Sequence, residues 1–349
     1  MMAAISYPVR KANWVLTYQG ANITADISSM VLAIIYLDYL EGAAGEIEIS
    51  LADEAGLWKG PWSPAQGDQV SLAIGYEGEQ LLPCGNFQVD ELEAEGPPDV
   101  FHLRCLAAYI VPAMRTANYA AYEGQTLLGI AGIIAAKYNL AVIGAPNSID
   151  VAFARVTQAH ETDLAFLQRL AREHDYGFTV RGNLLVFYAR AALESQPPVY
   201  TIQRTDVLRF QFRNKTHAVY QSARIAYQLP ATRELIAQTA AASPAPATGD
   251  MLKLTRRCEN GQQAFLKAQG GLHNANMMQM TASIALSGVT ILAAGNNVIV
   301  SGFGANDGTY LIQTARHRLS QTGGALPAGY STEIEARRVF PASGVQHGI

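Results

Sequence analysis

Residues 46–51 read Glu46-Ile47-Glu48-Ile49-Ser50-Leu51, with polar and apolar side chains in strict alternation. Successive side chains of a strand point to opposite faces, so this pattern predicts a strand with one buried and one exposed face. Further short runs of this kind follow turn residues at 70–74, 87–90 and 101–106. Short strands at roughly ten-residue spacing, separated by Gly and Pro turns, are typical of a sandwich or barrel. We therefore expect a β-barrel domain over residues 1–113.

The hydrophobic period then changes to that of helices. Residues 127–138 carry apolar side chains at i, i+3, i+4 and i+7, and a second helix is expected from Thr162 to Asp175. Thr162 is the expected N-cap, and Gly177 is the expected stop. A two-residue hairpin turn at Gly182-Asn183 follows. Residues 114–197 are thus predicted to form an α+β module.

The last third of the chain again has the period of strands, with an interruption. Residues 239–249 are rich in Ala, Pro and Ser, which predicts an exposed loop, and residues 259–272 have a helical period. The fold class we expect is mainly β, with two barrels, an α+β module and a small inserted helical segment. The remaining boundaries follow from these patterns: a second barrel at 198–236 and 277–340, the inserted loop and helix at 237–276, and a C-terminal tail at 341–349.

Two stretches of the chain are alike. Gly85-Asn86-Phe87-Gln88-Val89 in the first barrel corresponds in pattern to Gly308-Thr309-Tyr310-Leu311-Ile312 in the last. Either two unrelated barrels share common hairpin residues, or the barrel is duplicated. A duplicated barrel would matter because a trimer would present six similar barrels to a six-fold partner.

Composition restricts the class of protein. Only 15% of the 349 residues are charged, against about 25% in ordinary soluble chains, so we expect partners or sister subunits to cover much of the surface. A net charge of −4 argues against specific nucleic-acid binding. No apolar run approaches the ~20 residues of a membrane span, and no secretory signal is evident. Cys84, Cys105 and Cys258 form no disulfide framework, which fits a reducing compartment.

A search for chemistry finds no catalytic motif, and no metal or cofactor is expected. His160, Glu161 and Asp163 do not share a helix face as metal ligands would, so they are interpreted as a polar helix start. His174, in the last helical turn, is expected to be partly cationic. His317 is expected to make an inter-strand or interface hydrogen bond.

The other conspicuous side chains suggest surfaces rather than reactions. The acids Glu91, Glu93 and Glu95 alternate along a strand, which usually marks a solvated face. Trp58 and Trp62 are expected to pack on a barrel end or on a partner. The basic side chains near the C-terminus are expected to form salt bridges between subunits: Arg316, Arg318, Arg337 and Arg338. No interface residue is assigned.

The residues that carry a family resemblance lie along nearly the whole chain, from about 18 to 339. The stretch Glu161-Thr162-Asp163-Leu164-Ala165-Phe166-Leu167-Gln168-Arg169-Leu170-Ala171 is the most specific. With residues 20–26, 47–53, 85–91 and 302–310 it resembles the phage late control gene D family, the tail hub of contractile-tail phages.

The resemblance implies a homotrimeric ring at the distal end of the tail tube. Two tube-like barrels per chain would make three chains imitate one hexameric tube ring, and the other segments would seat the spike. Because the chain stops at Ile349 without β-helix repeats, the spike is expected to be a separate chain. The tube, baseplate wedge and tape-measure proteins are the other expected partners, with no membrane involved.

The expected location is the baseplate of a virion or phage-tail-like particle, assembled in the bacterial host cytoplasm. The sequence therefore predicts a structural hub and no enzyme. Two alternatives are a tail-associated cell-wall hydrolase, which the missing acid/base pair disfavours, and a late-gene transcription regulator, which the acidic composition and missing helix-turn-helix disfavour.

Overall fold

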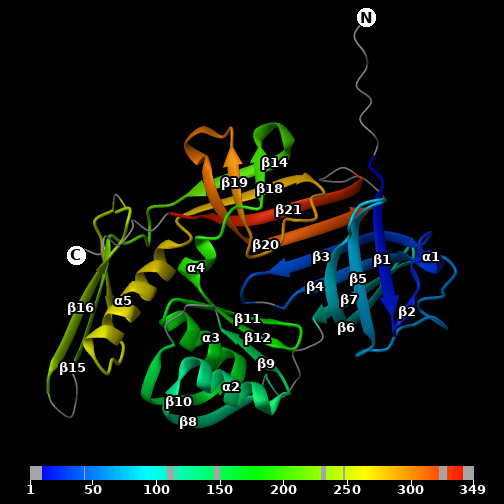
Figure 1. The fold of residues 1–349 in the computed structure, drawn as a ribbon. Helices are drawn as coiled ribbons and strands as arrows, with labels where there is room; N and C mark the ends of the chain where they lie inside the picture. Colours follow the sequence, from blue (N-terminus) through cyan, green and yellow to red (C-terminus); the bar gives the residue numbers. More distant parts are fainter. Residues whose placement is uncertain are drawn as a thin grey trace, which may run out of the picture.

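A thirteen-stranded sheet runs through the computed structural model of the chain and joins two β units side by side (Figure 1). The structure describes residues 10–42, 44–107, 114, 116–144, 150–228, 233–246, 248–321 and 328–340. The expected tail at 341–349 lies outside them. No helix in these ranges is long and apolar enough to cross a membrane. The expected fold class is confirmed: the chain is mainly β, with an α+β module and an inserted helical segment.

The first β unit is built from alternating sequences such as that of residues 46–51. Its inward side chains, among them Ile34, Ile47 and Ile74, are fully buried in one core. The elements of this unit are β1 (Ala12–Tyr18), β2 (Ala21–Asn22), α1 (Thr24–Ile27), β3 (Val31–Tyr39), β4 (Glu46–Ala52), β5 (Gln69–Tyr76), β6 (Leu82–Glu95) and β7 (Val100–Ala107).

The second β unit has its own core around Ile284, Tyr310 and Ile334. Its elements are β13 (Tyr200–Gln203), η2 (Arg204–Asp206), β14 (Val207–Asn214), β18 (Met280–Ser287), β19 (Asn297–Ser301), η3 (Gly304–Asn306), β20 (Gly308–Ser320) and β21 (Gly329–Arg338).

The two units repeat one strand order. The sheet runs β14-β18-β21-β20 and continues as β3-β4-β7-β6. When these four strands of each unit are numbered in chain order, both units have the spatial order first, second, fourth, third. The bulges repeat too. In each unit the third of these strands, β6 or β20, has a bulge, between Val89 and Glu91 in one and between Ile312 and Thr314 in the other. Of the two explanations left open by the sequence, the structure therefore favours a duplicated unit.

Antiparallel pairing of β20 with β3 joins the units. Arg316 lies opposite Leu37, and the ladder runs from Thr314 to Ser320. No hydrophobic period in the sequence could reveal this pairing, because the two strands lie far apart in the sequence. The sheet is consequently continuous across the boundary between the units.

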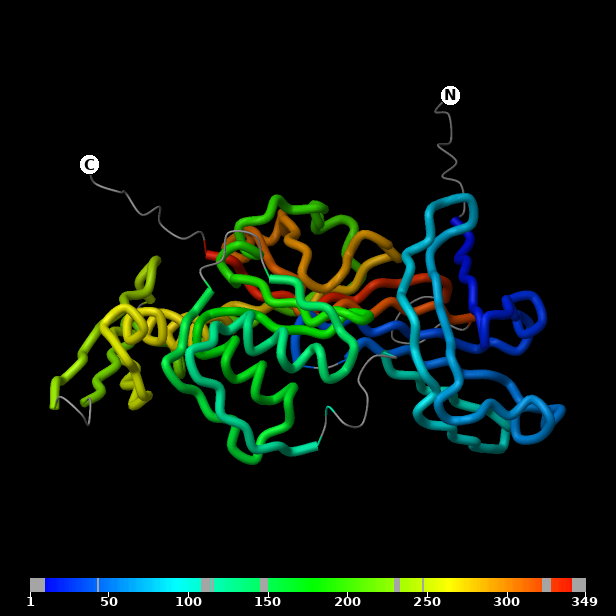
Figure 2. Tube along the Cα trace, turned by 60° about the horizontal axis from the view of Figure 1, so that its bottom comes forward, coloured from blue at the N-terminus to red at the C-terminus, as the bar shows by residue number. Residues whose placement is uncertain are grey.

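The α+β module packs below this sheet (Figures 1 and 2). Thr126 and Thr162 cap its two longer helices, each accepting a hydrogen bond from the backbone N–H three residues later, as expected for Thr162. The elements are β8 (Ala117–Thr126), α2 (Leu127–Lys137), β9 (Ala141–Gly144), β10 (Ala152–Thr162), α3 (Asp163–Glu173), β11 (Tyr176–Arg181), β12 (Leu184–Ala189) and α4 (Arg190–Glu194).

The inserted segment projects from the opposite side of the molecule to the first β unit (Figure 2). It is a helix on a three-stranded sheet, where the sequence predicted only a loop and a helix, and Thr239–Ala241 belong to a strand. The expected boundary at 236/237 falls inside one of these strands. The elements are β15 (Ser222–Gln228), β16 (Leu235–Ala241), β17 (Met251–Leu254) and α5 (Gly261–Asn276).

Gly177 does not end helix α3, contrary to the expectation. Asp175 takes the left-handed conformation there, with φ of 62°, and Gly177 lies in β11 under the ring of Tyr188. A Cβ at position 177 would lie 2.0 Å from the Cζ atom of Tyr188. The glycine is therefore required by a close side-chain contact and not by the turn.

Replacing Gly177 with alanine is expected to lower the free energy of unfolding by about 1–3 kcal/mol, because Tyr188 has to leave its position. Thermal unfolding measures the effect. Gly132, in the exposed face of α2 with open space around it, is the matched control, and Gly132→Ala is expected to stabilise by about 0.5–1 kcal/mol. Equal melting temperatures for Gly177→Ala and the wild type would contradict this account of the contact.

Candidate functional site

The polar residues at the start of α3 form a structural network. Asp163 is fully buried and accepts hydrogen bonds from Gln158, Tyr138 and Lys137, at 2.8, 2.7 and 3.2 Å. Burial alone raises the pKa of the Asp163 carboxyl, but these donors outweigh it and the pKa is lowered. In the described ranges, no group of three or more His, Cys, Asp or Glu side chains is arranged to hold a metal ion. The interpretation of this stretch as a polar helix start agrees with the geometry.

Two of the three histidines that the sequence singled out, His174 and His317, are buried, whereas His160 is exposed. His317 lies within hydrogen-bonding distance of the Tyr330 hydroxyl at 2.7 Å and of the Leu292 carbonyl at 2.9 Å, as an inter-strand bond requires. Burial lowers its pKa to about 4. His174 is also buried, and its pKa falls to about 3, chiefly because of burial, with Lys267 and Arg256 adding to the effect. The expectation of a partly cationic His174 is wrong.

Not all of the arginines near the C-terminus are available for salt bridges with other subunits. The guanidinium of Arg337 is buried against Glu194, with Nη2 2.6 Å from Oε1. Arg338 donates to the carbonyls of Ala305 and Asp307. The expectation of an intersubunit salt bridge is therefore wrong for Arg337, which is 3% exposed and pairs within the chain, and it stays a prediction for Arg316, Arg318 and Arg338.

Trp58 and Trp62 pack against the core of the first β unit, in the segment between β4 and β5. The Trp58 ring stacks on Phe101 and meets the Trp62 ring edge to face, with centroids 5.7 Å apart. Both tryptophans line an apolar hollow of about 290 Å³ beside α1.

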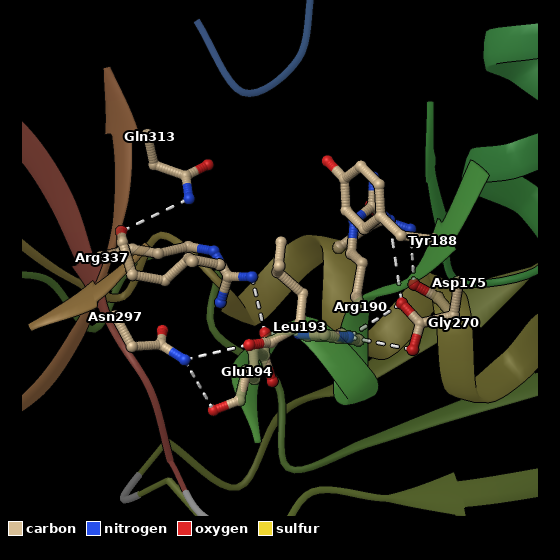
Figure 3. Close-up of polar contacts among 12 residues, drawn as sticks. Asp175, Tyr188, Arg190, Leu193, Glu194, Gly270, Asn297, Gln313 and Arg337 are labelled. Atoms are coloured by element: carbon tan, nitrogen blue, oxygen red, sulfur yellow. Dashed lines mark hydrogen bonds and ion pairs between the residues drawn. The ribbon is translucent and has the colours of Figure 1, made fainter. Parts of the chain in front are cut away.

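A buried cluster of ions ties all four parts of the chain together (Figure 3). Arg190 of α4 is 2% exposed, and its guanidinium lies 2.9 Å from Glu41 of the first β unit and 2.8 Å from the Asn274 side chain of α5. Arg337 of the second β unit meets Glu194 of the α+β module. Polar and charged side chains from four segments thus meet in one cluster, which fixes the segments relative to one another.

His273 of α5 occupies the centre of this cluster. Its Nδ1 lies 2.8 Å from Asp175 and its Nε2 lies 3.0 Å from Glu194. Burial on its own lowers the pKa of the imidazole, but the hydrogen bonds to the two carboxylates prevail and raise the pKa to about 9. Burial opposes ionisation of Glu194, yet His273 and Arg337 hold its pKa below the usual value. His273 is therefore cationic and Glu194 anionic at neutral pH.

This cluster predicts a pH dependence of stability. Because His273 has a raised pKa in the folded state, its contribution is fully present below about pH 6.5 and is lost as the pH rises through about 9. The contribution of Glu194, whose pKa is lowered, is lost instead in acid. We expect the melting temperature to fall between pH 6.5 and 9, corresponding to about 2–3 kcal/mol. The His273→Gln variant should lose most of this slope; an unchanged slope would contradict the assignment.

Two strand edges of the sheet are free and oppositely charged. In the ranges that the structure covers, β14 pairs only with β18, and residues Glu91–Glu95 of β6 pair only with β7. The β6 edge carries Glu91, Glu93 and Glu95, of which Glu91 and Glu95 also contact Arg104 and His102 of β7. The β14 edge carries Arg213, and Lys215 directly follows the strand. Exposed edges of this kind are ready to pair with another strand.

A duplicated β unit with two free strand edges of opposite charge is suited to pairing with further chains. The chain belongs to the phage tail baseplate hub (GPD) family, whose model matches residues 47–323. The family resemblance seen in the sequence is thereby confirmed. A curated relative, the probable baseplate hub protein of Escherichia phage 186, is 26% identical over 59% of this chain and 54% of its own length. The matched region thus spans about half of that relative.

Solved structures share the fold. The 43 kDa tail protein of prophage MuSo2 from Shewanella oneidensis superimposes with a TM-score of 0.72 at 17% identity, covering 94% of this chain and 98% of that protein. An E. coli component of the type VI secretion system gives a TM-score of 0.57 at 13% identity, covering 96% of this chain and 78% of that one. These similarities extend over the β units, the α+β module and the inserted segment alike.

Proposed function

We propose that the chain is the structural hub of a contractile-tail baseplate and that three copies close into a ring between the tail tube and the spike. The observation that carries this proposal is the duplicated β unit, because three chains then supply six similar units. Membership of the baseplate hub family supports the location in the tail.

The junction inside the chain supplies a template for the junction between chains. Within one chain, β20 of the second unit pairs with β3 of the first. The duplicated strand order makes β6 the counterpart of β20 and β14 the counterpart of β3. In a ring, β6 of one protomer therefore pairs with β14 of the next.

The repeated bulges support one register for this pairing. When the bulges of β6 and β20 are aligned, Glu91 corresponds to Thr314; when those of β14 and β3 are aligned, Arg209 corresponds to Ala33. Inside the chain, Arg316 of β20 faces Leu37 of β3, and Thr314 faces Tyr39. The same register applied to β6 and β14 gives two residue pairs across the proposed interface. Glu93 faces Arg213 of the next protomer, and Glu91 faces its Lys215.

Both pairs bring opposite charges together. Within the described part of the chain, neither Glu93 nor Arg213 has an ion-pair partner, so both are available to a neighbour. Directly opposed charges of this kind contribute about 0.2–1 kcal/mol each, and the backbone groups of two exposed edges pair at the same time. A head-to-tail contact that closes after three copies leaves no free edge of this type.

We further propose the division of labour among the segments. The two β units, at 1–113 and 198–340, form the ring. The second unit is interrupted by the inserted segment, which begins near β15 and ends after α5. The module 114–197 and this inserted segment bind the spike, which is a separate chain. Tube, wedge and tape-measure proteins are the further partners. We propose no catalytic role; clearing of cell-wall material in a lytic zymogram by the purified protein would contradict this.

Native mass spectrometry of the full chain, alone and with a candidate spike protein, tests the proposal. We expect a species of three chains that binds one spike trimer, and a ring of six similar lobes in electron micrographs. A monomer that ignores the spike would overturn it.

A further inference from the structure

Two adjoining hollows lie between the α+β module and the inserted segment, away from both sheet edges. Their volumes are about 410 and 300 Å³, and Arg169, Glu173 and Arg256 line both. Their walls come from β10, α3 and the chain that leads into α5. The cationic side chains that line them are Arg155, Arg169, Arg172, Arg256, Arg257 and Lys267.

Half of these cations are already used by the fold. Arg169 lies 3.0 Å from Glu161 and 3.5 Å from Glu173. Lys267, which is 8% exposed, donates to the Arg257 carbonyl at 2.9 Å and lies 3.5 Å from Glu173. Arg155 lies 3.6 Å from Glu123. The carboxylates near the hollows are therefore already engaged.

The other half have no carboxylate of their own. Within the residues placed by the structure, the guanidinium groups of Arg172, Arg256 and Arg257 have no ion-pair partner, and Glu259, the remaining acid, accepts from the backbone N–H groups of Ala154 and Arg155. Three uncompensated cations in one concavity produce a positive local potential on a chain whose net charge is −4.

The buried His174 lies near two of the lining cations, Lys267 and Arg256. Among the described residues neither of its ring nitrogens has a hydrogen-bond partner, and burial, with these two charges adding to it, lowers its pKa and keeps it neutral.

We propose that the basic hollow formed by Arg172, Arg256 and Arg257 is a docking site for an acidic segment of another protein, which supplies two or three carboxylates. A segment of protein fits better than a nucleic acid because the described residues that line the hollows offer no exposed ring on which a base could stack: their aromatic side chain, Phe153, is buried.

This inference goes beyond the ring and does not depend on it, because each protomer carries a complete hollow. Carboxylates that meet arginines in a partly enclosed site gain more than they would on an open surface. The contact is therefore expected to weaken with salt while remaining specific for the three arginines.

The experiment measures fluorescence anisotropy of a labelled, capped hexaglutamate peptide titrated with the full chain. We expect saturable binding that the double variant Arg256→Glu/Arg257→Glu weakens at least tenfold. The matched control is Arg224→Glu/Lys253→Glu, the same change of charge on the neighbouring strands β15 and β17, which should stay within twofold of the wild type. If the first variant does not fold, Arg172→Glu replaces it, with the same expectation.

Three results would overturn the proposal: no binding of hexaglutamate, an equal loss in the control variant, or tighter binding of a single-stranded thymidine hexanucleotide than of the peptide. The last result would assign the hollow to nucleic acid instead. None of these readouts depends on whether three chains associate, so a failure here is distinguishable from a failure of the proposed ring.

Discussion

Replacing Arg213 with glutamate is expected to prevent the chain from forming trimers. In the proposed interface Arg213 faces Glu93 of the next protomer, so the substitution removes an attraction and creates a repulsion, together about 1–2 kcal/mol per interface. The loss occurs at all three interfaces of the ring. Because 1.4 kcal/mol corresponds to a factor of ten, the combined effect shifts association by orders of magnitude. Sedimentation velocity measures it directly.

The compensating change makes this prediction specific for the register. The double variant Glu93→Arg/Arg213→Glu restores opposite charges and should recover the trimer. Arg316→Glu is the matched control. Arg316 is the counterpart of Glu93 on β20, and β20 already pairs with β3 inside the chain. Reversing the charge of Arg316 should therefore leave the trimer intact. Trimers that persist in Arg213→Glu, or double variants that stay monomeric, would contradict the pairing.

Replacing Arg190 with methionine is expected to destabilise the chain by about 3–5 kcal/mol. Arg190 is 2% exposed and pairs with Glu41, and removing one member of a buried ion pair leaves the other uncompensated. Its bond to Asn274 and its proximity to Asp175, at 3.7 Å, are lost as well. The first β unit, the α+β module and α5 should consequently separate more easily than any one of them unfolds.

Urea denaturation at one fixed protein concentration measures this effect, since association also contributes to stability. Lys11→Met is the matched control, because Lys11 and Glu77 form an ion pair in which both side chains are exposed, and such pairs contribute little. A loss of less than about 1 kcal/mol in Arg190→Met would contradict the role of the cluster.

The elements of the fold were largely predictable from the sequence. Alternation at residues 46–51 gave β4, and Thr162 marked the start of α3, because both signals are local. The end of α3 was wrongly assigned to Gly177, because the glycine at this position is required by the ring of Tyr188 on the neighbouring strand, which no local sequence signal reveals. The sheet of the inserted segment was missed because β15, β16 and β17 pair across a stretch that resembles a loop.

The candidate site was less predictable for the same physical reason. His273, Glu194 and Arg337 are single charges on separate segments, and only the folded chain brings them together. Glu93 was noticed as part of an alternating acidic strand, but its meaning depends on the counterpart relation between β6 and β20. The repeated strand order and bulges reveal that relation, and the pairing of β20 with β3, which no period in the sequence encodes, supplies the register.

A cross-link between protomers tests the ring most directly. The variant Glu93→Cys/Arg213→Cys places two thiols opposite each other across the proposed interface, while the native cysteines Cys84, Cys105 and Cys258 are buried. A short bismaleimide should convert this variant into covalent trimers that stop at three chains, and it should convert the shifted variant Glu93→Cys/Gln211→Cys much less efficiently. Equal products from both variants, or a ladder continuing beyond three chains, would contradict a closed ring of three paired in this register.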